Sequence, residues 1–357
     1  MLCFKQFLTL FLLCSFFSLS LQAASISTFY GDMEIDEPIL LDLINSPALQ
    51  RLKKVHQYGV SSYTTHRERY FRYDHSLGVM AILRKNGASL EEQISGLLHD
   101  VSHTAFSHVG DWVFPSENRE DSYHETIFEL FLACSGLEKL LHQHGYSVAQ
   151  ISPKNPKFIM LEQPLPALCA DRIDYNIQGA YYQGFIEKEE VLLLYNDLHF
   201  SQGAWWGSNK ELFKKLTEFS IFMTEDCWGS ADNYLTSAWF AQAIKLAIEH
   251  KMISWYDFHF GYDQEIWEKL YSSEETSIKK LMDKVTQPFH LFEIVSPEKA
   301  QMVIPFKCRA IDPLIKKENK LVPLSSICPS LAAKIERIRL LAKQGWPVKM
   351  AEGEALF

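Results

Sequence analysis

The stretch YDHSLGVMAILRKNGASLEEQISGLLHDVSHTAFSH, residues 73–108, contains four histidines and two aspartates between apolar side chains. Ser89 and Glu92 have the spacing of a capping box, which marks the start of a helix. Apolar residues then recur at helical spacing, at Ile94, Leu97, Leu98 and Val101. The pattern predicts a helix whose last turn carries the adjacent pair His99 and Asp100.

A second capping-box pair, Ser122 with Glu125, predicts a helix with His124 in its first turn. Its apolar positions are expected at Ile127, Leu130, Phe131 and Cys134. The same periodicity predicts further helices over residues 161–180, 187–196, 210–223, 231–250, 263–272, 274–286 and 330–344. Between residues 288 and 323 the pattern changes to short apolar runs separated by Pro and polar residues, which indicates strands.

These elements predict a mostly α fold with a small strand-containing C-terminal appendage. The main helical domain is expected over residues 30–286, with its core motifs at 50–185, and the α+β appendage over 287–357. The composition, 47% hydrophobic and 22% charged, is typical of a folded globular protein and excludes a long disordered chain.

Residues 1–23 carry one charge, Lys5, before an apolar run that ends in small residues, as in a secretory signal peptide. The run is short for a membrane-spanning helix, so we expect export with cleavage, and an uncleaved membrane anchor is the alternative. Without Lys5 the 35 basic residues become 34 against 44 acidic residues, a net charge of −10. An acidic surface disfavours extended nucleic-acid binding, which depends on neutralising phosphates.

The five cysteines beyond residue 23 are widely spaced and form no CxxC pair: Cys134, Cys169, Cys227, Cys308 and Cys328. This spacing supports neither a thiolate zinc site nor a disulfide framework. Buried free thiols are the simplest interpretation, although one or two bridges stay open after export.

The adjacent pair His99 and Asp100 can reach one metal ion only across a helix end, because neighbouring helical residues point about 100° apart. Further ligands must then come from other helices. The candidates are His75 and Asp171, the latter in CADRIDY, an apolar helical segment where charged groups need a partner or a metal. The resulting His2Asp2 set suits iron, manganese or zinc, and magnesium more weakly.

The order of these motifs resembles that of the HD-domain phosphohydrolases, most closely their deoxynucleoside triphosphate triphosphohydrolase branch. Enzymes of this branch are helical and cleave a dNTP into deoxynucleoside and triphosphate. The resemblance covers residues 36–185 and rests on QRLKKVHQYG, RYFRYDHSLGV, LLHDVSHTAFSH, YHE and ADRIDY. It implies that the metal ligands are His75, His99, Asp100 and Asp171.

The resemblance also implies a set of catalytic residues beyond the metal ligands. His103 and His108 match the second-shell and catalytic histidines of the motif HDxxHxxxxH, and Asp111 matches an acid that orients the catalytic histidine. His124 matches an active-site histidine that contacts phosphate. A histidine held by a carboxylate can donate a proton to a leaving oxygen or activate water.

Two arginines match phosphate-binding positions of the branch. Arg72 lies three residues before the first ligand, and Arg172 directly follows Asp171. Guanidinium groups there would stabilise charge on the non-bridging phosphate oxygens. The structural alternative is two ordinary ion pairs, Arg72 with Asp74 and Arg172 with Asp174.

The positions that would contact the sugar of a nucleotide match the branch in part and differ from it in part. Gln57 matches a glutamine that reaches the sugar hydroxyl, and Tyr175 matches a tyrosine beneath the sugar. However, Gly179 stands where the branch usually has an acid that binds the sugar, and Tyr58 is bulky where an aliphatic residue is common. Loss of a polar contact can change substrate discrimination by orders of magnitude, so the substrate need not be a dNTP.

We therefore expect an exported, metal-dependent phosphohydrolase that cleaves a nucleotide or related phosphate ester by water attack at phosphorus. A phosphomonoesterase or a hydrolase of signalling nucleotides is the alternative within the enzyme class. A catalytically silent protein that binds metal and nucleotide, or a structural partner that uses the C-terminal appendage as its interface, also stays open. The resemblance implies self-association into a homo-oligomer.

Overall fold

The computed structural model describes residues 23–65, 70–115 and 122–353. The predicted signal peptide therefore lies, apart from Ala23, outside the described residues. The chain is mostly helical, with small sheets that include C-terminal strands, which confirms the predicted fold class. Among the described helices, none combines the length and apolar character needed to cross a bilayer.

The helix α5 (Leu90–Leu98) begins and ends slightly inside its predicted range. Ser89 caps it through its Oγ, which accepts from the backbone N of Glu92 at 3.2 Å. The predicted reciprocal half of the capping box is wrong, because the Glu92 carboxylate instead accepts from Met160 N and Leu161 N. His99 is the C-cap residue, and Asp100 lies in the turn that follows rather than in the last helical turn.

The second predicted helix is divided at Ile127 into α7 (Tyr123–Thr126) and α8 (Phe128–Ser135). The Ser122 side chain makes no capping hydrogen bond, so this capping box was also wrong. Leu130 is 54% exposed and Cys134 is exposed, because the break rotates the buried face to other residues. The buried apolar residues of α8 are Phe128, Phe131 and Leu132.

The predicted helix over 161–180 forms only in its second half, as α11 (Ala170–Tyr182). Pro164 and Pro166 keep the preceding segment out of the helix, since proline lacks an N–H donor and restricts the residue before it. The other predicted helices are present: α12 (Lys188–Asn196), α13 (Lys210–Phe222), α14 (Ala231–Glu249), α16 (Asp263–Tyr271), α17 (Thr276–Thr286) and α19 (Pro329–Gln344).

Helix α4 (Arg72–Lys85) is central to the fold. Residues 75–83 of this helix are all buried, and α4 packs against both α5 and α11. The remaining short helices are α1 (Pro38–Asn45), α2 (Pro47–Arg51), η1 (Leu52–Lys54), α3 (Ser61–Thr64), η2 (Ser107–Val109), α6 (Gly110–Val113), α9 (Leu137–Gln143), α10 (Val148–Ile151), α15 (Trp255–Phe260), η4 (Pro288–His290), η5 (Pro297–Lys299) and α18 (Leu324–Ile327). A π-helical segment, η3 (Met223–Trp228), links α13 to α14.

The strands of the described residues form three small sheets. The hairpin of β1 (Ala24–Thr28) and β2 (Gly31–Ile35), which the sequence patterns did not predict, stands alone. A second sheet has the order β3 (His199–Ser201), β4 (Ala204–Gly207), β7 (Leu314–Lys317), β8 (Lys320–Pro323), with β4 and β7 parallel. The third has the order β5 (Phe292–Ile294), β9 (Trp346–Met350), β6 (Met302–Ile304).

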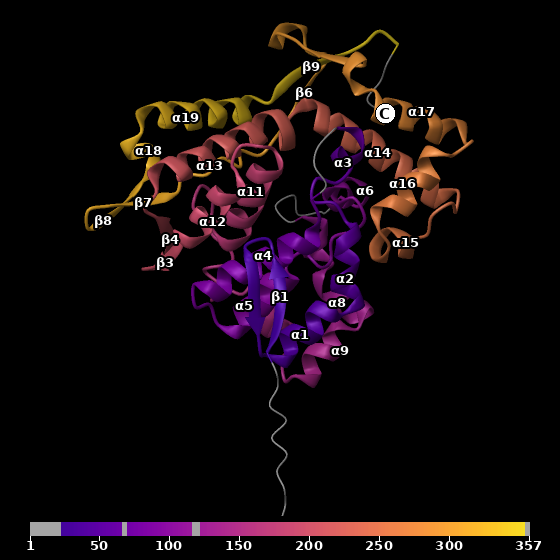
Figure 1. Cartoon of the computed structure of the whole chain (residues 1–357). Helices are drawn as coiled ribbons and strands as arrows, with labels where there is room; N and C mark the ends of the chain where they lie inside the picture. The colour runs from indigo at the N-terminus through magenta and orange to yellow at the C-terminus, as the bar shows by residue number, and fades with distance from the viewer. Residues whose placement is uncertain (1–22, 66–69, 116–121, 354–357) are drawn as a thin grey trace, which may run out of the picture.

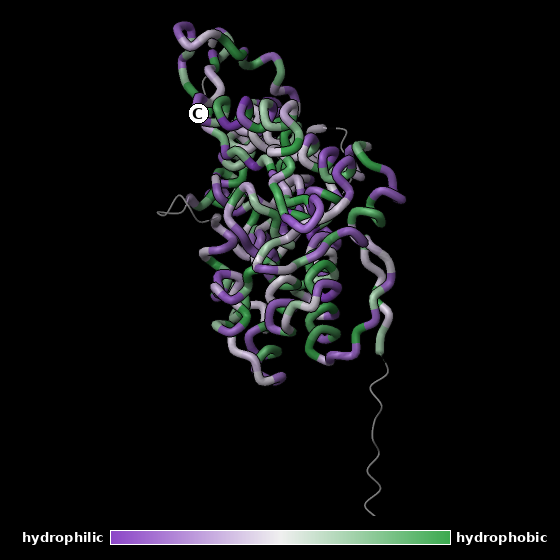
Figure 2. Tube along the Cα trace, turned by 90° about the vertical axis from the view of Figure 1, so that its left-hand side faces the viewer, coloured by the Kyte–Doolittle hydropathy of each residue, from purple (hydrophilic) through white to green (hydrophobic). Residues whose placement is uncertain are grey.

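Within the part of the chain that the structure describes, the buried apolar residues form three clusters. One lies around α11, α13 and α19, the second around α14 and α17, and the third around α1, α5 and α8. Figure 1 shows the same division, with α1, α5, α8 and α9 below, α11, α13 and α19 at upper left and α14–α17 at upper right. Hydrophobic and hydrophilic residues alternate along the helices (Figure 2), as expected for helices that bury one face.

Strands beyond residue 286 thus pair with the body of the chain, through the parallel contact of Trp206 with Leu314. Residues Ile311, Ile315 and Ile335 share a buried cluster with Phe213 and Phe219 of α13. Residues 287–353 are therefore held against the helices that precede them, and the boundary at residue 286 stays a prediction.

Candidate active site

Helix α4 and the end of α5 bring two imidazoles together, with their ring planes at 70° to one another. The Nε2 atoms of His75 and His99 lie 3.2 Å apart. The other ring nitrogen of His75, Nδ1, lies 2.7 Å from Asp174 Oδ2, and Nδ1 of His99 lies 2.7 Å from the Gly96 carbonyl oxygen. Because these oxygens can only accept, each Nδ1 carries a proton, and a ring that gives up its second proton presents the Nε2 lone pair to the space between the two rings.

Two carboxylates converge on the same point. Asp171 Oδ1, in the first turn of α11, lies 3.0 Å from His75 Nε2 and 3.5 Å from His99 Nε2. Asp100 contributes Oδ2 at 3.4 Å from His75 Nε2 and Oδ1 at 3.6 Å from His99 Nε2. The structure therefore brings together all four residues predicted to bind metal.

This donor set fits a divalent cation. Two lone pairs and two carboxylates facing one another repel unless a positive charge lies between them. Burial acts to lower the pKa of His75, but the Asp171 and Asp174 carboxylates outweigh it and raise that pKa to about 10. The pKa of His99 is also raised, by Asp100 and Asp171 against burial. The carboxylates around these two imidazoles therefore favour positive charge at this point.

Arg72 lies beside this donor set rather than on Asp74, so the predicted ion pair with Asp74 is wrong. Its Nη1 donates to Asp100 Oδ2, and its Nε donates to Ser107 Oγ at 2.6 Å. Although burial acts to raise the pKa of Asp100, Arg72 and His99 hold that pKa well below its usual range. Asp100 is therefore a carboxylate fixed between an arginine and the two imidazoles.

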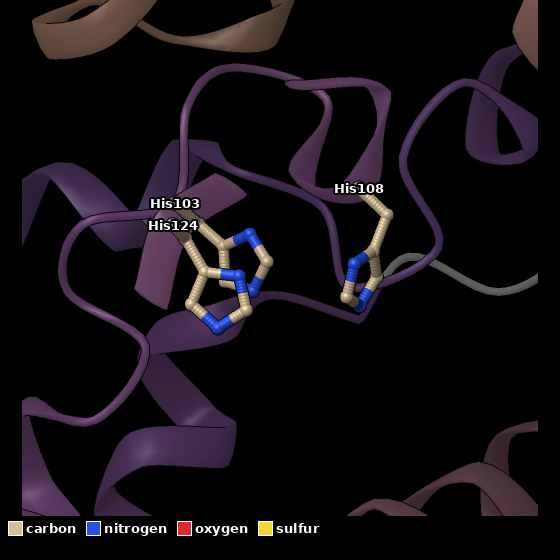
Figure 3. Close-up of side chains that lie close together, drawn as sticks. All are labelled: His103, His108 and His124. Atoms are coloured by element: carbon tan, nitrogen blue, oxygen red, sulfur yellow. The ribbon is translucent and has the colours of Figure 1, made fainter. Parts of the chain in front are cut away.

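On the other side of Asp100 three more histidines gather (Figure 3). The rings of His103 and His124 stack with centroids 3.6 Å apart, and the ring of His108 lies 4.9 Å from that of His103. Ring nitrogens of all three lie within 4.8 Å of one another, so this cluster could hold a second cation. Burial lowers the pKa of both His103 and His124 well below the usual range, which keeps these two rings neutral.

His108 is the accessible member of this cluster. Its side chain is 50% exposed, and its Nδ1 donates to Asp111 Oδ2 at 3.0 Å. The other oxygen of Asp111 accepts from the Tyr123 backbone N at 2.6 Å. The carboxylate is thereby fixed at the start of α6, and it orients an imidazole that solvent and substrate can reach.

A cavity of about 340 Å³ opens next to this imidazole. Arg72, His108 and Asp111 lie in its wall. Aromatic side chains form much of the remaining wall: Tyr58, Tyr70, Trp112, Tyr175, Trp228 and Tyr234. The size lies within the range of small-molecule sites, and flat rings suit a ligand with a planar part.

The predicted substrate residues fall into two groups. Gln57 and Tyr175 line the cavity, and the buried Oε1 of Gln57 has no hydrogen-bond partner among the described residues. Arg172 lies elsewhere, because its Nη1 donates to the carbonyl oxygens of Ala167 and Gln163 at 2.5 and 3.2 Å. The predicted alternative for Arg172, a pair with Asp174, is also wrong.

Asp174 is a site residue that the sequence patterns did not single out. It is fully buried and accepts from Tyr30 Oη at 2.8 Å and Tyr70 Oη at 3.3 Å, besides holding His75. Gly78 of α4 makes room for it, since a Cβ there would lie 1.9 Å from Asp174 Oδ1. The second aspartate of ADRIDY, one helical turn after Asp171, was the available indication.

The comparisons with known proteins identify the domain that carries these residues. Residues 72–176 match the family model of the HD domain. The chain is 33% identical to the uncharacterized protein YdhJ of Bacillus subtilis, over 90% of this chain and 97% of YdhJ. It is 37% identical to the metal-dependent phosphohydrolase cns2 of Cordyceps militaris, over 45% of this chain and 46% of cns2.

A more distant relative is the deoxynucleoside triphosphate triphosphohydrolase SAMHD1 of Danio rerio, 27% identical over 42% of this chain and 27% of SAMHD1. Two solved structures share the fold. A hypothetical protein from Aquifex aeolicus has a TM-score of 0.63 at 17% identity, covering 87% of this chain and 94% of that one. A phosphohydrolase from Bacteroides thetaiotaomicron has a TM-score of 0.58 at 15% identity, covering 85% and 94%.

Proposed function

The chain belongs to the HD-domain metal-dependent phosphohydrolases, and from this we propose that it hydrolyses a nucleotide by attack of water at phosphorus. The observation that carries the proposal is the position of the cavity, whose wall contains Arg72, His108 and Asp111 directly beside the His2Asp2 donor set. A phosphate that enters this cavity meets the accessible imidazole of His108 and the guanidinium of Arg72, which itself donates to the metal ligand Asp100.

His75, His99, Asp100 and Asp171 would hold the cation. When bound, it supplies Lewis acidity toward a phosphoryl oxygen and a water of lowered pKa. Asp174 and Gly96 keep the two imidazoles in the tautomer that presents Nε2.

The accessible imidazole of His108 carries the proton transfer in this proposal. The oxygen of water forms the new bond to phosphorus, the ester P–O bond breaks, and His108 delivers a proton to the leaving oxygen. Asp111 fixes the orientation of this imidazole, because one of its carboxylate oxygens lies 3.0 Å from Nδ1. The proton released by the attacking water restores the imidazole to its starting state.

Two observations bear on the substrate. The similarity to SAMHD1 supports a dNTP, cleaved to deoxynucleoside and triphosphate. The sugar-side departures, Gly179 and Tyr58, support another nucleotide or a phosphomonoester. The released product separates the two, since the first reaction yields triphosphate and the second yields orthophosphate.

The decisive experiment loads purified residues 25–357 with manganese or iron and screens for triphosphate and phosphate release, with Asp100→Ala as the matched variant. We expect bound metal and hydrolysis in the wild type and loss of both in the variant. A wild type that holds metal, binds nucleotide and never turns it over would support the silent binding protein instead.

Localisation is part of the same proposal. Residues 1–23 direct export, and N-terminal sequencing of the protein from an extracytoplasmic fraction would give a chain that begins near Ala24 or Ser25. A full-length chain retained in the membrane fraction would support the uncleaved anchor, and one in the cytoplasmic fraction would refute export.

A further inference from the structure

Two cations from the C-terminal part of the chain line the same cavity as His108. Lys307 and Arg309 lie between β6 and β7, about 200 residues beyond the HD motif, and both reach the cavity wall. Arg309 lies close enough to Tyr175 to act on its pKa, which burial raises to about 12 and which Arg172 and Arg309 act to lower. The cavity is thus lined both by residues near the HD motif and by residues of the segment between β6 and β7.

These two side chains have no carboxylate partner among the described residues. Some other cations of this acidic chain are paired, as Lys215 is with Glu190 and Lys334 with Glu218. Lys307 and Arg309 thus place two positive charges at the cavity wall of a chain whose net charge is −9. Positive groups directed at a concave site raise the local concentration of anions.

The segment that carries them is anchored. Arg309 N donates to Thr224 Oγ1 at 3.2 Å, which ties the segment to η3. The ring of Phe306 stacks on Trp346 with centroids 5.6 Å apart, and Trp346 Nε1 donates to the Gly229 carbonyl at 2.6 Å. Gly229 permits this packing, since a Cβ there would lie 2.5 Å from Phe306 Cδ2. The backbone from which Lys307 projects is therefore held on both sides.

We propose that Lys307 and Arg309 form an anion subsite that binds a phosphate beyond the one attacked at the metal ligands. The inference rests on the proposed function and deepens it, because it makes the substrate a nucleoside di- or triphosphate rather than a simple monoester. Arg172 does not compete for this role, since backbone carbonyls occupy its guanidinium. Bonds from guanidinium or ammonium to phosphate are charge-assisted and therefore strong.

The test measures binding of deoxyadenosine mono-, di- and triphosphate to the metal-loaded full domain by calorimetry, in a His108→Gln background that prevents turnover. We expect the triphosphate to bind about tenfold or more tightly than the monophosphate. The double variant Lys307→Ala/Arg309→Ala should lose that preference while its affinity for the monophosphate changes less than about threefold.

The matched control is Lys317→Ala/Lys320→Ala, which removes two exposed cations of the β7–β8 hairpin and changes the net charge equally. The control should keep the preference, and so should Lys307→Arg/Arg309→Lys, which retains both charges. Equal losses in the control, equal losses for mono- and triphosphate, or a wild type without phosphate preference would each overturn the subsite. Binding is read without hydrolysis, so failure of the proposed reaction is seen separately, as loss of product release in the wild type.

Discussion

The hydroxyl oxygen of Tyr58 lies 3.0 Å from the position that a Cβ atom on Gly179 would occupy. The two departures from the dNTP-cleaving pattern are therefore neighbours in space, although 121 positions separate them in the chain. The phenol fills the region where the related branch places an acid. Tyr58 thus both lines the cavity and leaves no free room for a side chain at Gly179.

This packing predicts that the acid cannot simply be restored. Gly179→Asp should lower the free energy of unfolding by about 1–3 kcal/mol, because the new side chain meets Tyr58 and also Phe219, whose Cζ lies 2.9 Å from the Cβ position. Chemical denaturation of four proteins, the wild type, Gly179→Asp, Tyr58→Leu and the double variant, measures the coupling. We expect the double variant to be more stable than the sum of the single effects predicts; strict additivity would contradict the contact.

Asp174 should control metal affinity without touching the metal. Asp174→Asn removes the carboxylate that holds His75 Nδ1 at 2.7 Å, and we expect metal affinity to fall about 10–100-fold. Competition with a chelator measures it. Asp74→Asn is the matched control, an acid from the same segment as His75 whose side chain lies outside the donor set, and its affinity should stay within about threefold of the wild type. Equal losses in both variants would mean that the effect is a general change of charge.

Metal loading should release protons. The pKa of His75 is raised to about 10 in the metal-free protein, so His75 is protonated at pH 7, whereas a ligating imidazole must be neutral. A pH-stat titration with manganese at pH 7 should therefore register close to one proton or more per chain, with a contribution from His99. The apparent affinity should rise as the pH increases toward 10. Metal uptake without proton release at pH 7 would refute this assignment of charge.

The sequence could predict what is local in the chain. The ligands His75, His99, Asp100 and Asp171 follow from motif order and helical spacing, and the structure does bring them together. The helical regions beyond residue 187 were likewise evident from apolar periodicity. The roles of these four ligands in the reaction stay predictions until activity is measured.

Contacts between distant segments could not be predicted in this way. The hydrogen bond from Tyr30 to Asp174 joins residues 144 positions apart, and no periodicity encodes it. Local patterns also misled where tertiary contacts prevailed: Glu92 has the spacing of a capping residue, yet its carboxylate binds the backbone at Met160 and Leu161. The position of Arg172 depends on the loop before α11, whose path the helical prediction over 161–180 had wrong.

The position of His108 in the cluster with His103 and His124 allows two roles for its imidazole, that of a proton donor and that of a ligand of a second metal ion. If His108 transfers a proton, as its bond to Asp111 indicates, then His108→Gln should lower kcat by about 10²–10⁴-fold and leave the metal content unchanged. Elemental analysis of the purified variant beside its kinetics decides the matter, with the exposed His142→Gln as a control that should alter neither quantity. A loss of one metal equivalent in His108→Gln would instead show that this imidazole is a ligand, because the three ring nitrogens lie close enough together to hold a cation.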